Sequence, residues 1–428
     1  MVLQKGQPPP GWPFCVFPVD NVIPMGNGLS FREVLALSLV RMVNGASRLT
    51  GRGSGTVAGG RVGLRLAPTL LGSMSRNRVI VIVSGTNGKT TTSAMIAKGW
   101  GGDVAANETG SNMPPGHLAA LSENVSERVV LEVDEAWLPA VTAVTSPAVV
   151  VLLNLSRDQL DRANEVRQMA GRWRTALATL DDNTVVVANA NDPLIVYGAE
   201  LAPRVVWCDV TTPWLEDAVS CPKCTSALVH EDGAWHCECG FAKPMASTVL
   251  GAALEVGDVE VELDLQMPGE FNRSNAAMAI TALNELGVDP TDSTSRIGEL
   301  ASVAGRFSVR RWRGHSLRLL LAKNPAGFTA MLPTVASGTS DLWIVINARV
   351  ADGHDPSWLY DVPFELLRGH RVYCFGDRRL DLATRLDYAG VSYVIVDDDA
   401  TVPLDEATVP VLANYTAFRE WLEKSSAA

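Results

Sequence analysis

A chain of 428 residues is too long for one ordinary hydrophobic core, so two or three domains are expected. The chain has 47% hydrophobic and 19% charged residues, as a globular enzyme does, and its formal net charge of −11 argues against a nucleic-acid-binding protein. No uninterrupted apolar stretch is long enough to cross a bilayer and no secretory signal is evident, so we expect a cytoplasmic protein.

The N-terminal region divides into an aperiodic and a periodic part. Residues 1–28 contain three consecutive prolines and predict a flexible extension, within which Met25 is an alternative start. A helical pattern follows at Phe31–Val43, and then a glycine-rich stretch at Gly51–Gly63. This region is short for a whole substrate-binding domain.

Residues 79–92 are the most informative segment, because an apolar strand leads there into a glycine-rich loop. Gly85 and Gly88 allow the backbone N–H groups to turn toward an anion. Lys89 adds a positive charge for the β- and γ-phosphates, and the Thr90 hydroxyl can hold Mg²⁺. The segment therefore predicts a site for a nucleoside triphosphate. The residues expected to contact the nucleotide here are Gly85, Thr86, Asn87, Gly88, Lys89, Thr90 and Thr91.

Strands and helices alternate from residue 78 onward, which predicts a parallel sheet covered by helices on both faces. The strands expected first are Val79–Val83, Val129–Val133, Ala148–Asn154 and Thr184–Ala188, with helices at Thr91–Gly99 and Ala163–Leu180 and, further on, strands within Leu250–Leu265 and a helix at Asn272–Leu286. Gly305-Arg306 has the character of a hinge. A second α/β series follows it, with strands at Ser316–Ala322, Leu342–Asn347, Arg371–Phe375, Ser392–Val396 and Val409–Ala413 and a last helix at Tyr415–Lys424.

Polar residues follow three strands of the first series, where ligands bind in open α/β sheets. Glu132 closes the second strand within an acidic run, and its carboxylate is well placed to complete Mg²⁺ coordination beside the Thr90 hydroxyl. The polar segment at 154–162 follows the third strand. Asn191 and Asp192 follow the fourth, and we expect both to contact the nucleotide. Taken alone, these last two segments are also compatible with ordinary polar turns.

Four of the seven cysteines form two close pairs, which indicates a metal site in a cytosolic chain. Cys221 and Cys224 have the usual Cys-x-x-Cys spacing, whereas Cys237 and Cys239 are one residue closer together. Four thiolates suit a closed, structural zinc site, here in a ribbon at about 216–245. His236 or Cys208 could substitute for one of these ligands, and reduced structural thiols are the alternative.

Two segments of the second series carry further chemistry. Lys323 follows a strand and could reach a transferring phosphate, although an Asn-Pro turn with a surface lysine explains it as well. The segment 352–361 holds three aspartates, a histidine and two aromatic residues. A helix N-terminus explains Asp355 and Pro356 but leaves Trp358 and the other acids without a role.

The loop Gly85-Thr-Asn-Gly-Lys-Thr-Thr is similar to the phosphate loop of the Mur ligase superfamily. Its members activate a carboxylate as an acyl phosphate with ATP and then let an amine attack it. Asn272 and Asn275 lie in a segment that resembles the superfamily's G-x-x-N-x-x-N sequence near the adenine, and Arg306 belongs to a pair that resembles its Gly-Arg linker. The resemblance implies a central ATP-binding domain at 29–305 and a Rossmann-like C-terminal domain at 306–428.

Three departures separate the chain from the amino-acid-adding members. The N-terminal region is too short for a UDP-sugar domain, an Asp-His pair is replaced by Asp158-Gln159, and the usual C-terminal motif is replaced by Leu321-Ala-Lys323-Asn-Pro. These departures and the cysteine ribbon resemble the family of synthetase subunits of lipid II isoglutaminyl synthases. The segments that carry this resemblance are Glu132–Ala136, Arg157–Arg162, Lys323–Phe328 and Asp352–Trp358.

That family implies amidation of the D-glutamate α-carboxylate of lipid II with ammonia from a GatD-type glutaminase, in a heterodimer working at the inner face of the membrane through its substrate. Lys89 and the loop amides would stabilise the transferring phosphoryl group, and Thr90 and Glu132 would hold Mg²⁺. An aspartate of the C-terminal domain completes the partner's Cys-His pair; Asp355 is our choice, with Asp352 and Asp361 as alternatives.

Two other interpretations stay open at this stage. The chain could add an amino acid, as other Mur ligases or a folylpolyglutamate synthase do, or it could be a non-catalytic nucleotide-binding scaffold. The phosphate loop does not distinguish ATP from other nucleotides, because it binds phosphates and not the base.

Overall fold

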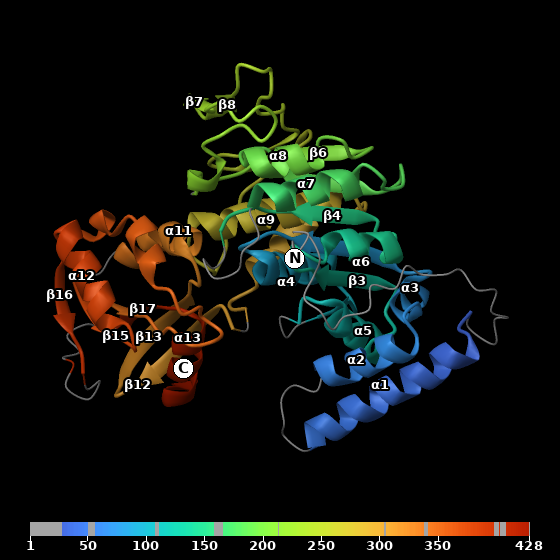
Figure 1. The fold of residues 1–428 in the computed structure, drawn as a ribbon, viewed down its shortest axis with the longest axis horizontal. Coiled ribbons are helices and arrows are strands. Elements are labelled where there is room, and N and C mark those ends of the chain that lie inside the picture. The colour runs from blue at the N-terminus through green and yellow to red at the C-terminus, as the bar shows by residue number, and fades with distance from the viewer. Residues whose placement is uncertain are drawn as a thin grey trace, which may run out of the picture.

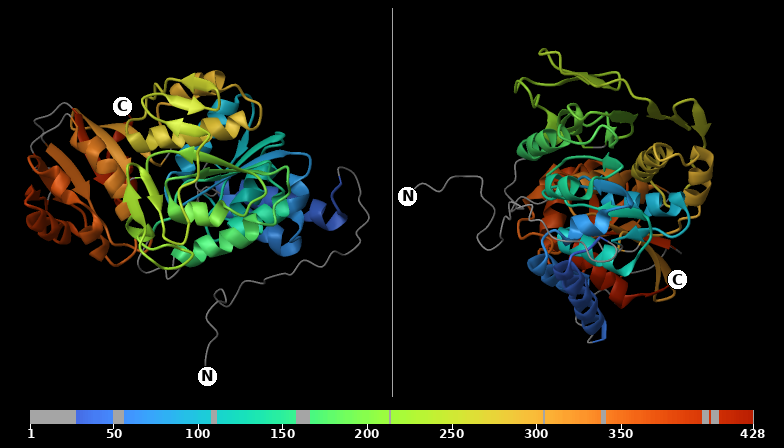
Figure 2. Two further views of the ribbon diagram at one scale, coloured as in Figure 1. Left: turned by 90° about the horizontal axis from the view of Figure 1, so that it is seen from above. Right: turned by 90° about the vertical axis from the view of Figure 1, so that its right-hand side faces the viewer.

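The structure is a computed structural model that describes residues 28–49, 56–107, 111–157, 166–212, 214–303, 305–337, 341–397, 402 and 408–427. The extension expected at 1–28 lies outside these residues except for its last position, and so does the Asp158–Arg162 segment. Two β-sheets organise the described chain, each with helices on both faces (Figure 1). Figure 2 shows the two sheets and their helices from above and from one side.

The first sheet has nine strands in the order β11-β10-β9-β6-β5-β4-β1-β3-β2. Its strands are parallel except for β10 and β11, which form an antiparallel edge. Their bounds are β1 Val79–Ser84, β2 Ala105–Ala106, β3 Arg128–Glu132, β4 Val149–Leu152, β5 Val185–Asn189, β6 Val205–Asp209, β9 Thr248–Leu250, β10 Leu254–Val256 and β11 Val259–Val261.

The side chains of β1 alternate between two hydrophobic cores, as a strand buried on both faces must. Val81 and Val83 pack toward one group of helices, and Ile80 and Ile82 pack toward the other. The first group is α4 Lys89–Trp100, α9 Glu270–Asn284 and α10 Pro290–Gly298; the second is α3 Leu70–Ser75, α5 Pro114–Glu123, α6 Leu138–Thr145, α7 Val166–Leu177 and α8 Pro193–Ala199. The predicted α/β architecture of this region is confirmed.

The second sheet has seven strands in the order β16-β15-β14-β17-β13-β12-β18, parallel except for β12 and β18. Their bounds are β12 Phe307–Trp312, β13 His315–Leu321, β14 Asp341–Val345, β15 Arg371–Phe375, β16 Ser392–Ile395, β17 Thr408–Ala413 and β18 Ser426–Ala427. One face carries α11 Pro325–Ala336, α12 Arg379–Ala389 and two 3₁₀ turns, η2 Ser357–Asp361 and η3 Phe364–Leu367, and the other carries α13 Tyr415–Lys424. The second α/β series is therefore confirmed as well.

Two further helices, α1 Phe31–Leu49 and α2 Thr56–Leu66, precede α3 and β1. The sequence pattern did not predict α2, because it is rich in glycine. Its glycines are packing residues: a Cβ atom on Gly60 would lie 1.9 Å from the carbonyl oxygen of Pro115. Gly63 likewise lies against Val40 of α1 and Leu118 of α5. The absence of side chains thus lets α2 fit between α1 and α5.

A small hairpin, β7 Val229–Glu231 and β8 Ala234–His236, projects from the first sheet near α8 (Figure 1). Its core is formed by Trp235 and Phe241, which pack with Val196 of α8, and the Trp235 indole donates to the Ala190 carbonyl oxygen at 3.1 Å. Within the described part of the chain, no helix combines the length and the apolar character needed to cross a membrane.

Candidate functional site

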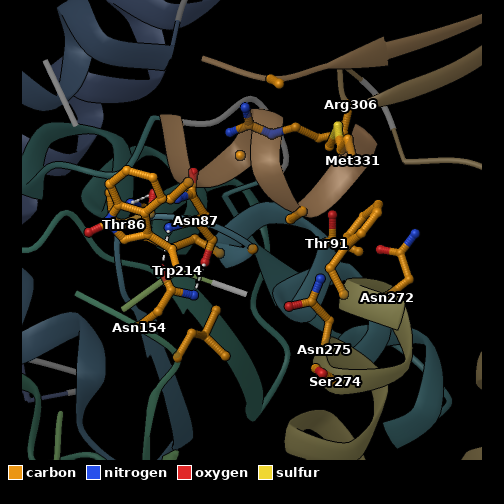
Figure 3. Close-up of a pocket in the computed structure, with 18 of the residues that line it drawn as sticks. Thr86, Asn87, Thr91, Asn154, Trp214, Asn272, Ser274, Asn275, Arg306 and Met331 are labelled. Carbon is orange, nitrogen blue, oxygen red and sulfur yellow. Dashed lines mark hydrogen bonds between the residues drawn. The ribbon is translucent and has the colours of Figure 1, made fainter. Parts of the chain in front are cut away.

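A cavity lies between the carboxyl ends of the first sheet and the beginning of the second (Figure 3). One wall is the loop between β1 and α4, and the opposite wall is formed by β13 and α11 of the second sheet. The sequence-predicted residues that line the cavity are Thr86, Asn87, Gly88, Lys89, Thr91, Glu132, Asp192, Asn272, Asn275, Arg306 and Lys323. The fold therefore brings together residues that are more than two hundred positions apart.

The phosphate loop is held in place by the segment that follows β4. Asn154 binds the loop three times: its side-chain oxygen accepts from the Asn87 amide at 2.9 Å, its side-chain nitrogen donates to the Asn87 carbonyl oxygen at 3.1 Å, and its own carbonyl oxygen accepts from the Thr86 amide at 2.9 Å (Figure 3). The Thr86 hydroxyl adds a bond to the Ser156 carbonyl oxygen at 3.1 Å. Glycine is required at position 85, where φ is +142° and a Cβ atom would lie 3.0 Å from the backbone of Asn154.

The ammonium group of Lys89 is buried at the loop. It donates to the carbonyl oxygens of Gly85 and, at 3.3 Å, of Thr86, and it forms an ion pair with Glu135 at 3.1 Å. A buried lysine needs such partners, because an unpaired charge at this depth would be strongly unfavourable. Glu135 thus neutralises Lys89 at the place where phosphate oxygens would lie.

The Thr90 hydroxyl lies between the carboxylate of Glu132 and the guanidinium of Arg306. It donates to the Glu132 carboxylate at 2.7 Å and accepts from the Arg306 guanidinium at 2.9 and 3.2 Å. A hydroxyl and a carboxylate this close are oxygen ligands of the kind Mg²⁺ prefers, so this pair fits the predicted metal position. Arg306 comes from the chain that leads into β12, so it joins the second sheet to the phosphate loop.

The backbone of Glu132 is fixed by two buried polar side chains. His117 lies with its Nε2 atom 2.8 Å from the Glu132 carbonyl oxygen, and Asn107 accepts from the Glu132 amide at 2.8 Å and donates to its carbonyl oxygen at 2.9 Å. Burial lowers the pKa of His117 to about 4, so the ring is neutral at pH 7 and its Nε2–H donates to Glu132.

The pKa of Asp134 is affected by two lysines, one from each wall of the cavity. Burial, and then the charge of Glu135, raise the pKa of Asp134, while the positive charges of Lys89 and Lys323 oppose that increase. Lys323 therefore exerts its field on the same part of the cavity as Lys89, although it follows β13 of the second sheet.

The start of α9 carries Asn272 and Asn275, for which proximity to the adenine stays a prediction. Asn275 lies directly against the phosphate loop, since a Cβ atom on Gly88 would be 2.5 Å from its side-chain oxygen. Asn272 donates to the Pro268 carbonyl oxygen at 2.7 Å, which ties it to the residues just before the helix. Figure 3 shows both asparagines on one side of the cavity, with Thr91 and Ser274 nearby.

Asn191 and Asp192 have internal partners. Asp192 caps α8 by accepting from the amides of Leu194 and Ile195, and its second oxygen accepts from Leu155 at 2.8 Å. The Asn191 side chain donates to Asp209 at 2.6 Å and to the Val210 carbonyl oxygen at 2.8 Å. These bonds hold the loop after β5 against the segment after β4 and the end of β6, and contact with a nucleotide stays a prediction for both residues.

The four clustered cysteines meet as the sequence predicts: every pair of sulfur atoms lies within 4.8 Å. The Cys221–Cys239 distance is 3.7 Å and the Cys224–Cys237 distance is 3.3 Å. A tetrahedral zinc ion with Zn–S bonds of about 2.3 Å needs sulfur separations of about 3.8 Å. Hydrogen bonds from the backbone and side chain of Ser226 lower the pKa of Cys224 to about 6, which favours the thiolate that binds metal. The short Cys-x-Cys pair therefore does not prevent all four thiols from converging.

The three aspartates of the 352–361 segment have different surroundings. Asp352 is buried and accepts from both the amide and the hydroxyl of Thr416 at the start of α13. Asp361 lies 3.7 Å from Arg157 of the first sheet. Asp355 is exposed and accepts from the Ser357 amide at 2.8 Å, which lowers its pKa and keeps it ionised.

Sequence reasoning missed several residues that shape the site. The sequence predicts Asn154 only as part of a polar segment and predicts no role for His117 or Asn107. It also does not predict the ion pair between Glu135 and Lys89. The position of Asn154 at the carboxyl end of a buried strand next to β1 is a signal that could have found it. His117 and Asn107 carry no such signal, because their contacts with Glu132 form only in the folded chain.

Comparison with known proteins agrees with this geometry. The chain matches the family model of the Mur ligase middle domain over residues 83–283 and that of the MurT ligase C-terminal domain over residues 321–418. Solved structures with a similar fold include a pseudomurein peptide ligase type C from Methanothermus fervidus, with 18% identity, a TM-score of 0.63 and coverage of 81% of this chain and 79% of that one. A second is MurF from Acinetobacter baumannii, with 14% identity, a TM-score of 0.61 and coverage of 85% and 79%.

The chain has the Mur ligase fold. Its matches to the middle-domain model and to the MurT C-terminal model together cover most of the chain and place it in the Mur ligase family. Within this family it groups with the MurT subunits. It is 28% identical to the MurT subunit of the glutamine-hydrolysing lipid II isoglutaminyl synthase of Staphylococcus aureus (strain COL), over 92% of this chain and 98% of that protein. It is also 28% identical to the corresponding subunit of Streptococcus pneumoniae, over 87% and 92%.

The clamp on the phosphate loop leads to a prediction. Asn154→Ala removes two hydrogen bonds to Asn87. The backbone amide and the carbonyl oxygen of Asn87 then lack these partners. At about 1–3 kcal/mol for an unsatisfied group, we expect ATP affinity to fall about tenfold. Calorimetric titration with ATP and Mg²⁺ measures this. Asn183→Ala, at an exposed turn, is the control and should bind ATP as the unmodified chain does. Equal ATP affinity in both variants would contradict the role of the clamp.

Proposed function

We propose that this chain is the ATP-dependent synthetase subunit that amidates the α-carboxylate of the D-glutamate in the lipid II stem peptide. The observation that carries the proposal is the match of nearly the whole chain to MurT subunits of lipid II isoglutaminyl synthases. The cavity supports it, because a phosphate loop and a lysine of the second sheet face one another there. We also propose that residues 29–305 and 306–428 are the two domains that hold this cavity between them, after an extension at 1–28.

The first half of the reaction is phosphoryl transfer to the carboxylate. A carboxylate oxygen attacks the γ-phosphorus of ATP, the bond to the ADP oxygen breaks, and an acyl phosphate forms. Lys89 and the loop amides would stabilise charge on the transferring group, and Lys323 would approach it from the opposite wall; their lining of one cavity supports these roles. Thr90 and Glu132 would hold Mg²⁺, which neutralises charge on the phosphates when bound.

The second half uses ammonia as the nucleophile. Ammonia attacks the acyl carbon, inorganic phosphate leaves with the C–O electron pair, and a proton is lost to give the amide of D-isoglutamine. The Staphylococcus aureus relative is a subunit of a glutamine-hydrolysing synthase, which supports a GatD-type glutaminase partner as the ammonia source. The lipid-linked substrate would place the reaction at the inner face of the cytoplasmic membrane.

Asp355 is the residue we propose for completing the partner's Cys-His pair. Its exposure and its ionised carboxylate support this choice, since an acid in that role must reach another chain and stabilise a charged imidazole. Asp352 is less suited because Thr416 already occupies both of its oxygens. Asp361 faces Arg157 and so points toward the first sheet of its own chain.

The test separates the two sources of nitrogen. Asp355→Asn should abolish glutamine-dependent amidation in the complex with the glutaminase and leave ammonia-dependent amidation unchanged, because only glutamine hydrolysis needs the triad. Asp361→Asn is the matched control and should keep both activities. Lipid II amidation is followed by mass spectrometry.

An equal loss of both activities in Asp355→Asn would place this residue in the synthetase site and overturn its assignment. The same assay tests the whole proposal: if the chain adds an amino acid in place of ammonia, or makes no amide from ATP and ammonia, the proposed function is wrong.

We further propose that the four cysteines bind one structural zinc ion. The convergence of four thiols suits a closed site that stabilises the β7–β8 hairpin. Because Trp235 of this hairpin donates to the Ala190 carbonyl oxygen beside Asn191, the zinc ribbon would also support the loop after β5.

We expect one zinc per chain by elemental analysis, and its loss in the Cys224→Ser and Cys239→Ser variants. Cys208→Ala is the control: burial raises the pKa of the Cys208 thiol to about 12, and this residue is not part of the cluster, so zinc content should not change. A zinc-free chain with an intact thermal transition would contradict the proposal.

A further inference from the structure

The helix α1 has two faces of opposite character. Its inner face carries Ala36 and Val40, which are fully buried against α2, α3 and α5. Its outer face carries Phe31, Leu35 and Met42, whose exposed fractions are 71%, 52% and 66%. These three residues are spaced by four and seven positions, so they form one stripe along the helix. Figure 1 shows α1 at the periphery of the molecule, with α2 and α5 between it and the sheet.

The charge around this stripe is opposite to that of the whole chain. Residues 28–78 contain eight arginines, no lysine and a single acidic residue, a formal charge of +7, whereas the chain as a whole carries −11. The one acid, Glu33, is buried and accepts hydrogen bonds from Ser30, Thr69 and Ser73. The surface presented by the described part of α1 and α2 is therefore apolar and basic, with no exposed carboxylate.

Exposed arginines border the stripe on both sides. Arg32 and Arg41 lie on α1 and are fixed by hydrogen bonds to the carbonyl oxygens of Leu66 and Ser122. Arg61 and Arg65 are exposed on α2. This pattern of large apolar residues flanked by arginine is typical of helices that lie in the interface of a membrane with anionic lipids.

We propose that the outer surface of α1, with the exposed arginines of α1 and α2, docks onto a bilayer that carries anionic lipid. The helix would lie on the bilayer and not cross it, because no described helix is suited to span a membrane. Phe31, Leu35 and Met42 enter the boundary between headgroups and acyl chains, and the arginines contact lipid phosphates.

The outer surface of α1 is connected to the cavity through packed helices. α2 packs between α1 and α5, and α5 carries His117, which binds the carbonyl oxygen of Glu132. Docking through α1 would therefore hold the cavity at a fixed distance from the lipid surface. The inference goes beyond the proposed function, because it rests on the surface of α1 and α2 and needs no turnover.

The experiment is co-sedimentation of the full chain with vesicles that contain neither lipid II nor ATP. One set is pure phosphatidylcholine and the other is an equal mixture of phosphatidylcholine and phosphatidylglycerol. The chain should bind only the anionic vesicles, and binding should fall as salt rises from about 0.1 M to about 1 M, which shortens the Debye length from about 10 Å to about 3 Å.

Two variants test the two components of the surface. The charge variant, Arg61→Glu with Arg65→Glu, should reduce binding to anionic vesicles at least about tenfold, as expected from about 1 kcal/mol per arginine near such a surface. The apolar variant, Phe31→Gln with Leu35→Gln and Met42→Gln, should also reduce it about tenfold. Both change exposed residues, and thermal unfolding verifies that each variant is folded.

Matched controls carry the same changes elsewhere. Arg172→Glu with Arg419→Glu alters two exposed arginines of α7 and α13, and Leu201→Gln with Val219→Gln and Met245→Gln alters apolar residues that are 51%, 59% and 94% exposed. Both controls should bind as the unmodified chain does. The proposal is overturned if the chain does not bind anionic vesicles. The outer surface of α1 would then contact a protein or another segment of the chain. Equal binding of the α1 and α2 variants and their controls would overturn it too.

Discussion

The hydroxyl oxygen of Thr90 connects three parts of the molecule. It donates to Glu132 at the end of β3, and it accepts from Arg306 at the entry to the second sheet, while its own backbone belongs to the helix that begins at the phosphate loop. The relative positions of the loop, the acid and the second sheet are therefore set around one atom. Every function proposed for the cavity depends on this arrangement, because the γ-phosphate must lie where these parts meet.

The two walls of the cavity contribute different properties. The wall from the first sheet is general: a glycine-rich loop, a buried lysine and a carboxylate serve phosphoryl transfer in many proteins. The wall from the second sheet contributes Lys323, and the exposed acid Asp355 of the same sheet region lies outside the cavity lining. In the proposed function, the first sheet therefore provides carboxylate activation, and the second sheet contacts the partner that supplies ammonia.

Much of the fold and part of the site could be predicted from the sequence. The strand, loop and helix around Lys89 follow from local patterns, and so does the convergence of the four cysteines, because spacing alone determines both. The helix α2 was missed because its glycines matter through contacts with α1 and α5, which no local pattern contains. The three bonds of Asn154 to the loop and the burial of Asp352 under Thr416 were missed for the same reason.

In the proposed function, this chain activates a carboxylate by phosphorylating it. The most direct measurement uses lipid II with ¹⁸O in the α-carboxylate of its D-glutamate, together with ATP, Mg²⁺ and ammonia. We expect one ¹⁸O atom in inorganic phosphate for each amide formed, because the oxygen that attacks the γ-phosphorus leaves with the phosphate. Amide formation with no ¹⁸O in the phosphate would contradict an acyl phosphate and the role assigned to the loop around Lys89.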